Sequence, residues 1–146
     1  SDIVSTISNI TEPAVIFAIA GKNERLHQKL SALSLPAHID LRIIGWTNDI
    51  DEYIRLAAAI ITKPGGLTTT ECATLGKPII AVSPIPGQEE HNAEYILENG
   101  LGVVAHTPED LLYYTSQPAN TLTRRVEQKE ARGATPAEII LATIAK

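Results

Sequence analysis

The chain has 146 residues, of which 44% are apolar and 20% are charged, a composition typical of one soluble globular domain with its own core. Its formal net charge of -5 offers no basic face for a nucleic-acid backbone, so we expect no nucleic acid as a partner. A single cysteine excludes an internal disulfide, the four histidines lack metal-ligand spacing with it, and no apolar run reaches the roughly 18 residues of a membrane span. We therefore expect no transmembrane segment, no metal and no other cofactor.

Strand-like and helical segments alternate along the first 105 residues. Uninterrupted apolar runs, such as residues 14–20, are typical of strands buried on both faces of a parallel sheet. Between them, apolar residues recur at helical spacing. The expected strands cover residues 14–20, 39–44, 58–62, 78–82 and 102–105. The expected helices cover residues 1–10, 22–34, 50–57, 67–75 and 88–98, the last of them ending at Asn99 and Gly100.

The pattern becomes helical after residue 105. Thr107 and Pro108 open a helix, because proline suits the first helical turn. From residue 120 onward the chain looks helical to its end, with a break at Gly133 and a last apolar helix over residues 139–144. The alternation predicts an α/β fold in a single domain, with a doubly wound, mostly parallel Rossmann-like sheet of about five strands. We expect its core at about residues 14–105 and C-terminal helices at about 107–146.

The loop that follows the third expected strand has the chemistry of an anion site. Gly65 and Gly66 let the backbone approach a ligand, and the next helix offers free amides and the positive end of its dipole. Such an end favours an anion by roughly 0.3–1 kcal/mol when exposed. The hydroxyls of residues 68–70 would add donors, so a phosphate or diphosphate is the expected ligand. The alternative is structural: Thr68 and Glu71 have the spacing of a capping box.

The loop over residues 84–92, after the fourth strand, would leave the same edge of a parallel sheet, where such sheets bind ligands. Two prolines stiffen it, and Gly87 permits an unusual turn. Amide and carboxylate groups then follow, and beside a phosphate they could hydrogen-bond sugar hydroxyls. In the alternative interpretation, Glu89 and Glu90 only complement the helix dipole.

Several standard nucleotide and hydrolase motifs are absent. The sequence contains no G-x-x-x-x-G-K-[ST] and no G-x-G-x-x-G after a strand, so ATP-type and NAD-type phosphate loops are not indicated. It also lacks the G-x-S-x-G of a nucleophile elbow.

Four segments together resemble the sugar-nucleotide-binding half of GT-B glycosyltransferases. They are TKPGGLTTTE (62–71), GKP (76–78), PGQEEHN (86–92) and ENG (98–100). The similarity is to the monogalactosyl- and glucosyl-diacylglycerol synthases and to the bacterial transferase that completes lipid II. The segments GKNERL (21–26) and GWT (45–47) also resemble this family, and the match runs from about residue 14 to 102.

The resemblance implies a UDP-sugar site. It assigns Gly65, Gly66 and Thr68 to the diphosphate, Glu71 to the ribose, Gln88, Glu89 and Asn92 to the donor sugar, and Gly45, Trp46 and Thr47 to the uracil. We expect Pro86 and Gly87 to be further substrate-binding residues in the second loop. Lys63 would add charge near the phosphates, with a plain surface lysine as the alternative.

The resemblance also implies an activity. Family members are inverting transferases that move a hexose from UDP-glucose, UDP-galactose or UDP-N-acetylglucosamine to a lipid-type acceptor, at the cytoplasmic face of a membrane and as peripheral proteins. Their N-terminal acceptor domain, which usually supplies the catalytic base, and their Gly-rich loop have no counterpart in this chain. We therefore expect a donor-binding half with no catalytic residue and little turnover alone. The alternatives are a stand-alone donor-binding subunit that needs a partner chain, and a fragment of a UDP-sugar epimerase.

Overall fold

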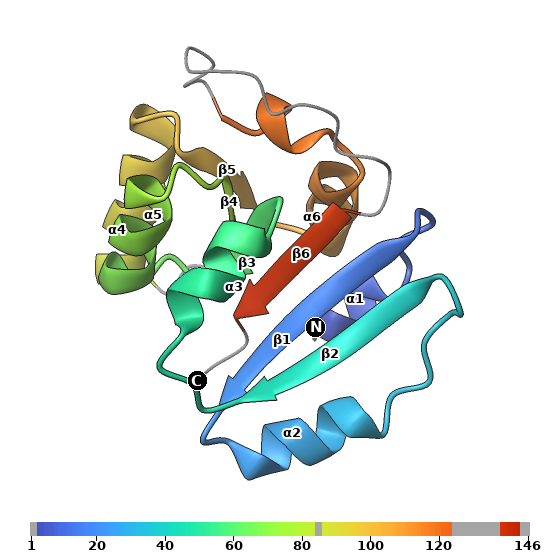
Figure 1. Ribbon diagram of the computed structural model, residues 1–146. Coiled ribbons are helices and arrows are strands. Elements are labelled where there is room, and N and C mark those ends of the chain that lie inside the picture. The colour runs from blue at the N-terminus through green and yellow to red at the C-terminus, as the bar shows by residue number, and fades with distance from the viewer. Residues whose placement is uncertain (1–2, 84–85, 124–137, 144–146) are drawn as a thin grey trace.

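Six parallel strands form the central sheet of the computed structural model, which describes residues 3–83, 86–123 and 138–143 (Figure 1). The strands are β1 (Ala14–Gly21), β2 (Ile39–Gly45), β3 (Ala59–Thr62), β4 (Ile79–Val82), β5 (Gly102–Ala105) and β6 (Glu138–Thr143). Their order across the sheet is β2-β1-β6-β3-β4-β5. The five strands expected before residue 106 are confirmed, as is the α/β class.

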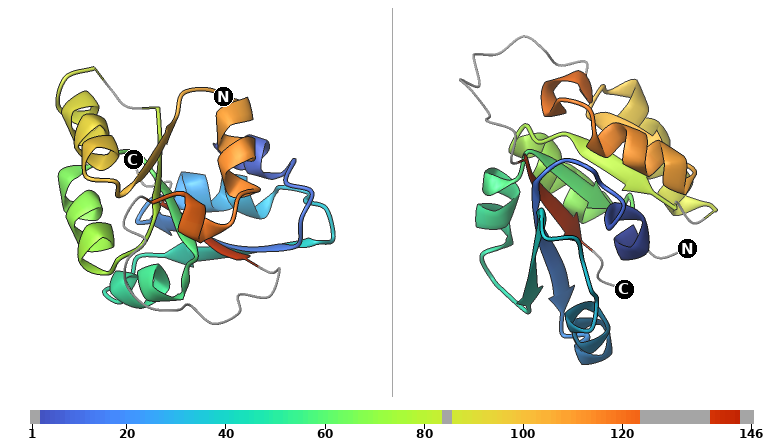
Figure 2. Two further views of the ribbon diagram at one scale, coloured as in Figure 1. Left: turned by 90° about the horizontal axis from the view of Figure 1, so that it is seen from above. Right: turned by 90° about the vertical axis from the view of Figure 1, so that its right-hand side faces the viewer.

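Helices cover both faces of this sheet (Figure 2). They are α1 (Ile3–Ile7), α2 (Glu24–Ser31), α3 (Ile50–Leu56), α4 (Gly66–Thr74), α5 (Gln88–Glu98) and α6 (Pro108–Thr115), with a 3-10 turn η1 (Ala119–Thr121). Buried residues of α1, α2 and α6 join one core, and those of α3, α4 and α5 join the other. The predicted doubly wound arrangement is therefore confirmed.

The short strands β3 and β4 serve both cores at once. Ile61 and Ile80 face the α1/α2/α6 side, whereas the preceding residues, Ile60 and Ile79, face the α3/α4/α5 side. Successive side chains of a strand point to opposite faces, so a strand covered on both faces has no position that faces solvent. This explains the uninterrupted apolar runs in the sequence.

The last strand corrects the sequence prediction. The helix expected over residues 139–144 is wrong: β6 lies there instead, paired in parallel with β1 on one side and β3 on the other. A short apolar run fits a buried strand as well as a helix, and here pairing on both edges satisfies the backbone of the run. β6 thereby joins the pair β1 and β2 to the group β3, β4 and β5. The helix expected from residue 120 is reduced to the single turn η1 before residue 124, and residues 124–137 lie outside the described part of the chain.

The sheet leaves no room for a side chain at one position of β5. A β-carbon on Gly102 would overlap the carbonyl oxygen of Ile79 and lie 2.7 Å from its carbonyl carbon. We expect Gly102→Ala to lower the free energy of unfolding by about 1–3 kcal/mol or more, because backbone atoms of β4 would have to move. Gly45→Ala is the control, since its β-carbon would meet its nearest atom, the Gly21 oxygen, at 3.9 Å. Urea denaturation of both variants measures the difference, and equal stabilities would contradict this account of the packing.

Candidate functional site

The loop before α4 and the start of α5 lie against each other at one edge of the sheet. β3 and β4 are neighbours with Thr62 opposite Ala81, so both chains leave the sheet at the same level. The side-chain amide of Asn92 in α5 donates a hydrogen bond of 2.8 Å to the carbonyl oxygen of Pro64, two residues before the first residue of α4. α4 and α5 run side by side from these loops (Figure 1). The expectation that both loops leave the same edge of the sheet is confirmed.

Open backbone amides mark the start of α4. Its N-cap is Gly65, and the first bond of the helix runs from the Thr69 amide to the Gly65 oxygen at 2.9 Å. Within the described chain, the amides of Gly66, Leu67 and Thr68 have no hydrogen-bond partner, as expected of a first helical turn without a side-chain cap.

The two glycines leave space in front of those amides. Gly65 has an ordinary φ of -77°. A β-carbon on Gly65 or Gly66 would meet no described protein atom within 4 Å. Neither backbone strain nor packing therefore requires glycine at these two positions, and Gly66 is exposed.

The capping-box interpretation of Thr68 and Glu71 is wrong. Since Gly65 is the N-cap, Thr68 lies inside the first turn, and no bond joins its hydroxyl to the backbone. Both side chains are half-buried, and a spacing of three residues places them on one face of α4. Neither forms a hydrogen bond or ion pair with any residue that the structure describes, so the Glu71 carboxylate is open to a ligand.

The sequence predicted that the hydroxyls of Thr69 and Thr70 would also be donors in the site, but the structure does not place them so. Thr69 is buried, with 3% of its surface exposed, and its hydroxyl has no partner among the described atoms. Thr70 donates its hydroxyl back to the Gly66 carbonyl at 2.9 Å. Of the three hydroxyls, that of Thr68 alone stays available beside the open amides.

Glycine and glutamate shape the second loop. Gly87 has φ 100° and ψ -117°, a conformation that only glycine adopts without strain. The Glu90 carboxylate accepts a hydrogen bond of 3.1 Å from the Gly87 amide and so caps α5. Pro86 and Gln88 are exposed and Glu89 is half-buried. Glu90 thus serves the start of the helix, as the alternative interpretation predicted. The Gln88 side chain has no partner among the described residues.

A third group lies at the end of the edge strand β2. Trp46, which follows Gly45, is 60% exposed, and the Lys22 ammonium lies 5.3 Å from its ring centroid. The Thr47 hydroxyl accepts a hydrogen bond of 3.0 Å from the Asp49 amide, which closes the turn into α3. At a strand spacing of about 4.8 Å, β2 lies roughly 14 Å from β3 across β1 and β6. The structure therefore separates this group from the two adjoining loops.

Lys63 lies between β3 and the open amides of α4. It is half-buried, and its ammonium forms no ion pair with the described acidic groups. An unpaired cation at this place can add positive charge to the start of α4.

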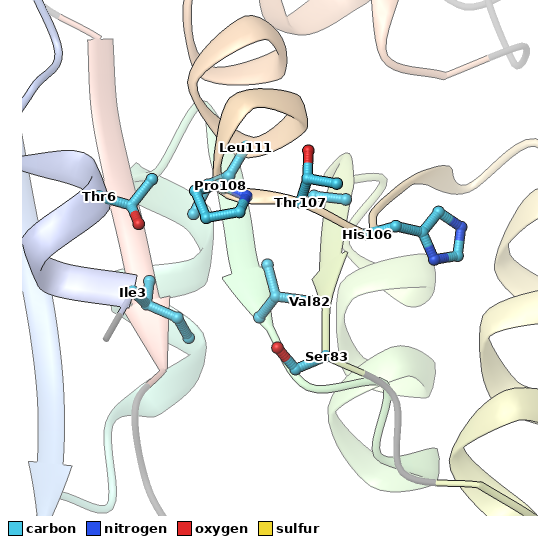
Figure 3. A pocket seen from close by; sticks show the side chains of 9 residues that line it. Ile3, Thr6, Val82, Ser83, His106, Thr107, Pro108 and Leu111 are labelled. Atoms are coloured by element: carbon cyan, nitrogen blue, oxygen red, sulfur yellow. The ribbon is translucent and has the colours of Figure 1, made fainter. Parts of the chain in front are cut away.

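One hollow at this edge was missed by the sequence analysis. It measures about 140 Å³ and lies between α1, the ends of β4 and β5 and the first turn of α6 (Figure 3). Ser83, at a positive φ of 44°, and His106 contribute polar groups to it. Both residues directly follow expected strands, which was the signal available in the sequence. None of the predicted site residues lines this hollow.

Among residues 3–83, 86–123 and 138–143, no three histidine, cysteine or acidic side chains converge on a position for a metal ion. No helix in the same part is both long enough and apolar enough to cross a membrane.

Comparison with known proteins identifies the family. The family model "Glycosyl transferases group 1" matches residues 2–116. A processive diacylglycerol beta-glucosyltransferase of Bacillus subtilis (strain 168) is 35% identical over 135 residues, which cover 90% of this chain and 35% of the relative. Proteins of the same name match at 41% over 97 residues in Bacillus pumilus (strain SAFR-032) and at 36% over 116 residues in Bacillus cereus (strain B4264). These two alignments cover 66% and 80% of this chain but only 25% and 30% of the relatives.

The aligned part of the chain thus spans only about a quarter to a third of the length of these three glucosyltransferases. The family model extends from α1 through α6 and so includes the loops before α4 and α5. The chain belongs to the group 1 glycosyl transferases, and its relatives include the GT-B glycolipid glycosyltransferases that its motifs resemble.

Proposed function

We propose that this chain binds a UDP-sugar and forms the donor-binding part of an inverting glycosyltransferase that transfers a hexose to a lipid-type acceptor. One observation carries the proposal. Three backbone amides at the start of α4 have no described partner, and no described atom lies within 4 Å of where a β-carbon on Gly65 or Gly66 would be. The unpaired Glu71 carboxylate lies on the same short helix.

The diphosphate of the donor would bind at this helix start. Open amides and the helix dipole attract anions, and Lys63 and the Thr68 hydroxyl would add a charge and a donor. As the bond to the sugar breaks, negative charge grows on the leaving diphosphate. Donors that are already in place stabilise this charge without reorganisation, and they require no metal ion.

Glu71 would bind the ribose. Removing a carboxylate from water costs free energy unless it gains a hydrogen-bond partner, so the half-buried and unpaired Glu71 carboxylate is suited to accept hydrogen bonds from ligand hydroxyls. The two ribose hydroxyls are such donors. This role is compatible with its position within two turns of the open amides of α4.

The donor sugar would lie along the start of α5. Gln88, Glu89 and the exposed turn of Pro86 and Gly87 offer amide, carboxylate and backbone groups to sugar hydroxyls. UDP-glucose, UDP-galactose and UDP-N-acetylglucosamine all present such hydroxyls. The relatives named as diacylglycerol glucosyltransferases favour UDP-glucose as donor and diacylglycerol as acceptor.

Uracil would bind near Gly45, Trp46 and Thr47. An exposed aromatic ring can stack with a base, an interaction worth about 1–3 kcal/mol per base where it has been measured by alanine substitution. One side of the Trp46 ring is already near Lys22. The opposite side of the ring is the one we assign to the base.

The rest of the transferase would supply acceptor binding and the catalytic base, so we propose little turnover by this chain alone and a peripheral location at the cytoplasmic face of a membrane. The matched relatives are longer transferases, which favours this function over a stand-alone subunit or an epimerase fragment.

Trp46 provides a direct test, because it is the single tryptophan of the chain. We expect UDP and UDP-glucose to change its fluorescence in a saturable way, and ADP and GDP to do so more weakly. Calorimetry with the same nucleotides checks the affinities. Equal responses to all three nucleoside diphosphates at millimolar concentration would contradict a uridine site.

Gly66→Ala separates a binding role from a folding role. Because Gly66 is the first helical residue and its β-carbon would meet no protein atom, alanine should raise the free energy of unfolding by about 0.4–1 kcal/mol. The same methyl group should weaken UDP binding by obstructing the amides. Thr74→Ala, near the other end of α4, is the control and should leave UDP binding unchanged. Tighter or unaltered UDP binding by Gly66→Ala would refute the assignment of the diphosphate.

Glu71→Gln tests the ribose contact. Hydrogen bonds to a charged acceptor contribute about 1.5–3 kcal/mol, so UDP affinity should fall about tenfold or more while the melting temperature changes little. Glu98→Gln, on the exposed side of α5, is the matched control. The comparison of UDP with 2'-deoxy-UDP sharpens the test: the wild-type preference for the ribose form should shrink in Glu71→Gln. An undiminished preference would assign the ribose to another residue.

A further inference from the structure

Asn92 connects the two loops of the candidate site through the protein backbone. It lies in the second turn of α5 and is half-buried. Its side-chain nitrogen donates to the Pro64 carbonyl oxygen at 2.8 Å, across 28 positions of the sequence. The acceptor is a carbonyl, so this contact uses the amide nitrogen of Asn92, a group that could otherwise donate to a sugar hydroxyl.

The Pro64 carbonyl has an alternative partner nearby. Thr68 follows Pro64 by four residues, which is the spacing of an α-helical hydrogen bond. That bond is not formed: α4 begins one residue later, with the bond from the Thr69 amide to the Gly65 oxygen. The carbonyl that could pair with the Thr68 amide is bound by Asn92 instead.

We propose that Asn92 is a positioning residue for the donor diphosphate. By holding the Pro64 carbonyl, Asn92 prevents α4 from starting one residue earlier, so that Gly65 is its N-cap. The Thr68 amide then stays open as the third donor beside those of Gly66 and Leu67. It also fixes the start of α5, with Gln88, relative to the start of α4. This inference rests on the proposed function. In it, the side-chain nitrogen of Asn92 binds the Pro64 carbonyl and does not contact the donor sugar.

The same helix supplies a matched control. Asn99, at the end of α5, donates its side-chain amide to the Tyr95 carbonyl oxygen at 2.9 Å. This is also a bond from an asparagine to a backbone carbonyl, but it stays within α5 and far along the helix from the loops. Asn92→Ala and Asn99→Ala therefore each remove one bond of the same chemical type.

Nucleotide affinity distinguishes the two possible roles of Asn92. In Asn92→Ala, we expect the affinities for UDP and for UDP-glucose to fall by the same factor, roughly 3- to 10-fold, because the diphosphate cradle common to both is altered. Asn99→Ala should bind both nucleotides like the wild-type chain. Amide hydrogen exchange without nucleotide provides an independent readout: the Thr68 amide should exchange more slowly in Asn92→Ala, since it can now pair with Pro64.

The possible outcomes are distinct. A loss for UDP-glucose with unchanged UDP affinity would show that Asn92 contacts the sugar, and would overturn the positioning role. A lower melting temperature with both affinities unchanged would also overturn it. Absence of UDP binding by the wild-type chain would overturn the proposed function together with this role, whereas UDP binding that survives Asn92→Ala undiminished overturns only the role of Asn92.

Discussion

The parallel pairing of β3 with β4 is the constraint on which the candidate site depends. Parallel strands must be joined by a crossover connection, which is usually right-handed. The direction in which the chain moves across the sheet therefore determines on which face the connecting helix packs. From β3 to β4 and from β4 to β5 the chain moves in one direction, so α4 and α5 pack on the same face. From β1 to β2 it moves the opposite way, and α2 packs on the other face. The two helix starts therefore meet at one edge because of topology, before any side chain of the site contributes.

The start of α4 is built differently from the start of α6. α6 has Pro108 in its first turn and Thr107 as N-cap, and the Thr107 and His106 amides donate to Asp110, which holds the pKa of this carboxyl below its usual value. α4 begins instead with two glycines and no side-chain cap, and it is rich in threonine, a residue of modest helix propensity. Burial of Cys72 holds α4 on the sheet, and its desolvation raises the pKa of the thiol to about 12. A weak helix start kept in place by packing is the pattern expected where binding, and not stability, determines the local sequence.

The sequence predicted most of this architecture because its signals are local. Apolar runs and helical spacing identified five strands and the six helices α1 to α6, and Gly-Gly after β3 identified the loop. Three features needed information from distant parts of the chain. Residues 139–142 fit a strand or a helix until β1 and β3 are seen to pair with them. The spacing of Thr68 and Glu71 is the same whether Thr68 is the N-cap of the helix or lies inside a helix that begins at Gly66. The bond from Asn92 to Pro64 joins two loops whose contact depends on the pairing of β3 with β4.

The charge of the chain explains why a site built on backbone amides suits this protein. With a formal charge of -5, the chain has no excess of positive charge to attract a dianionic nucleotide from a distance. At physiological ionic strength, charges more than about 8 Å apart are largely screened, so the groups in direct contact determine the affinity. Amide donors are neutral and rigid, and they bind a phosphate without the ordering of long side chains that lysines require. The lysines at this edge, Lys22 beside Trp46 and Lys63 before α4, lie at the two ends of the proposed nucleotide. In the proposed arrangement the amides of α4 interact with the charge of the diphosphate, which leaves the acceptor groups of Glu71 and Gln88 to the neutral hydroxyls of the ribose and the sugar.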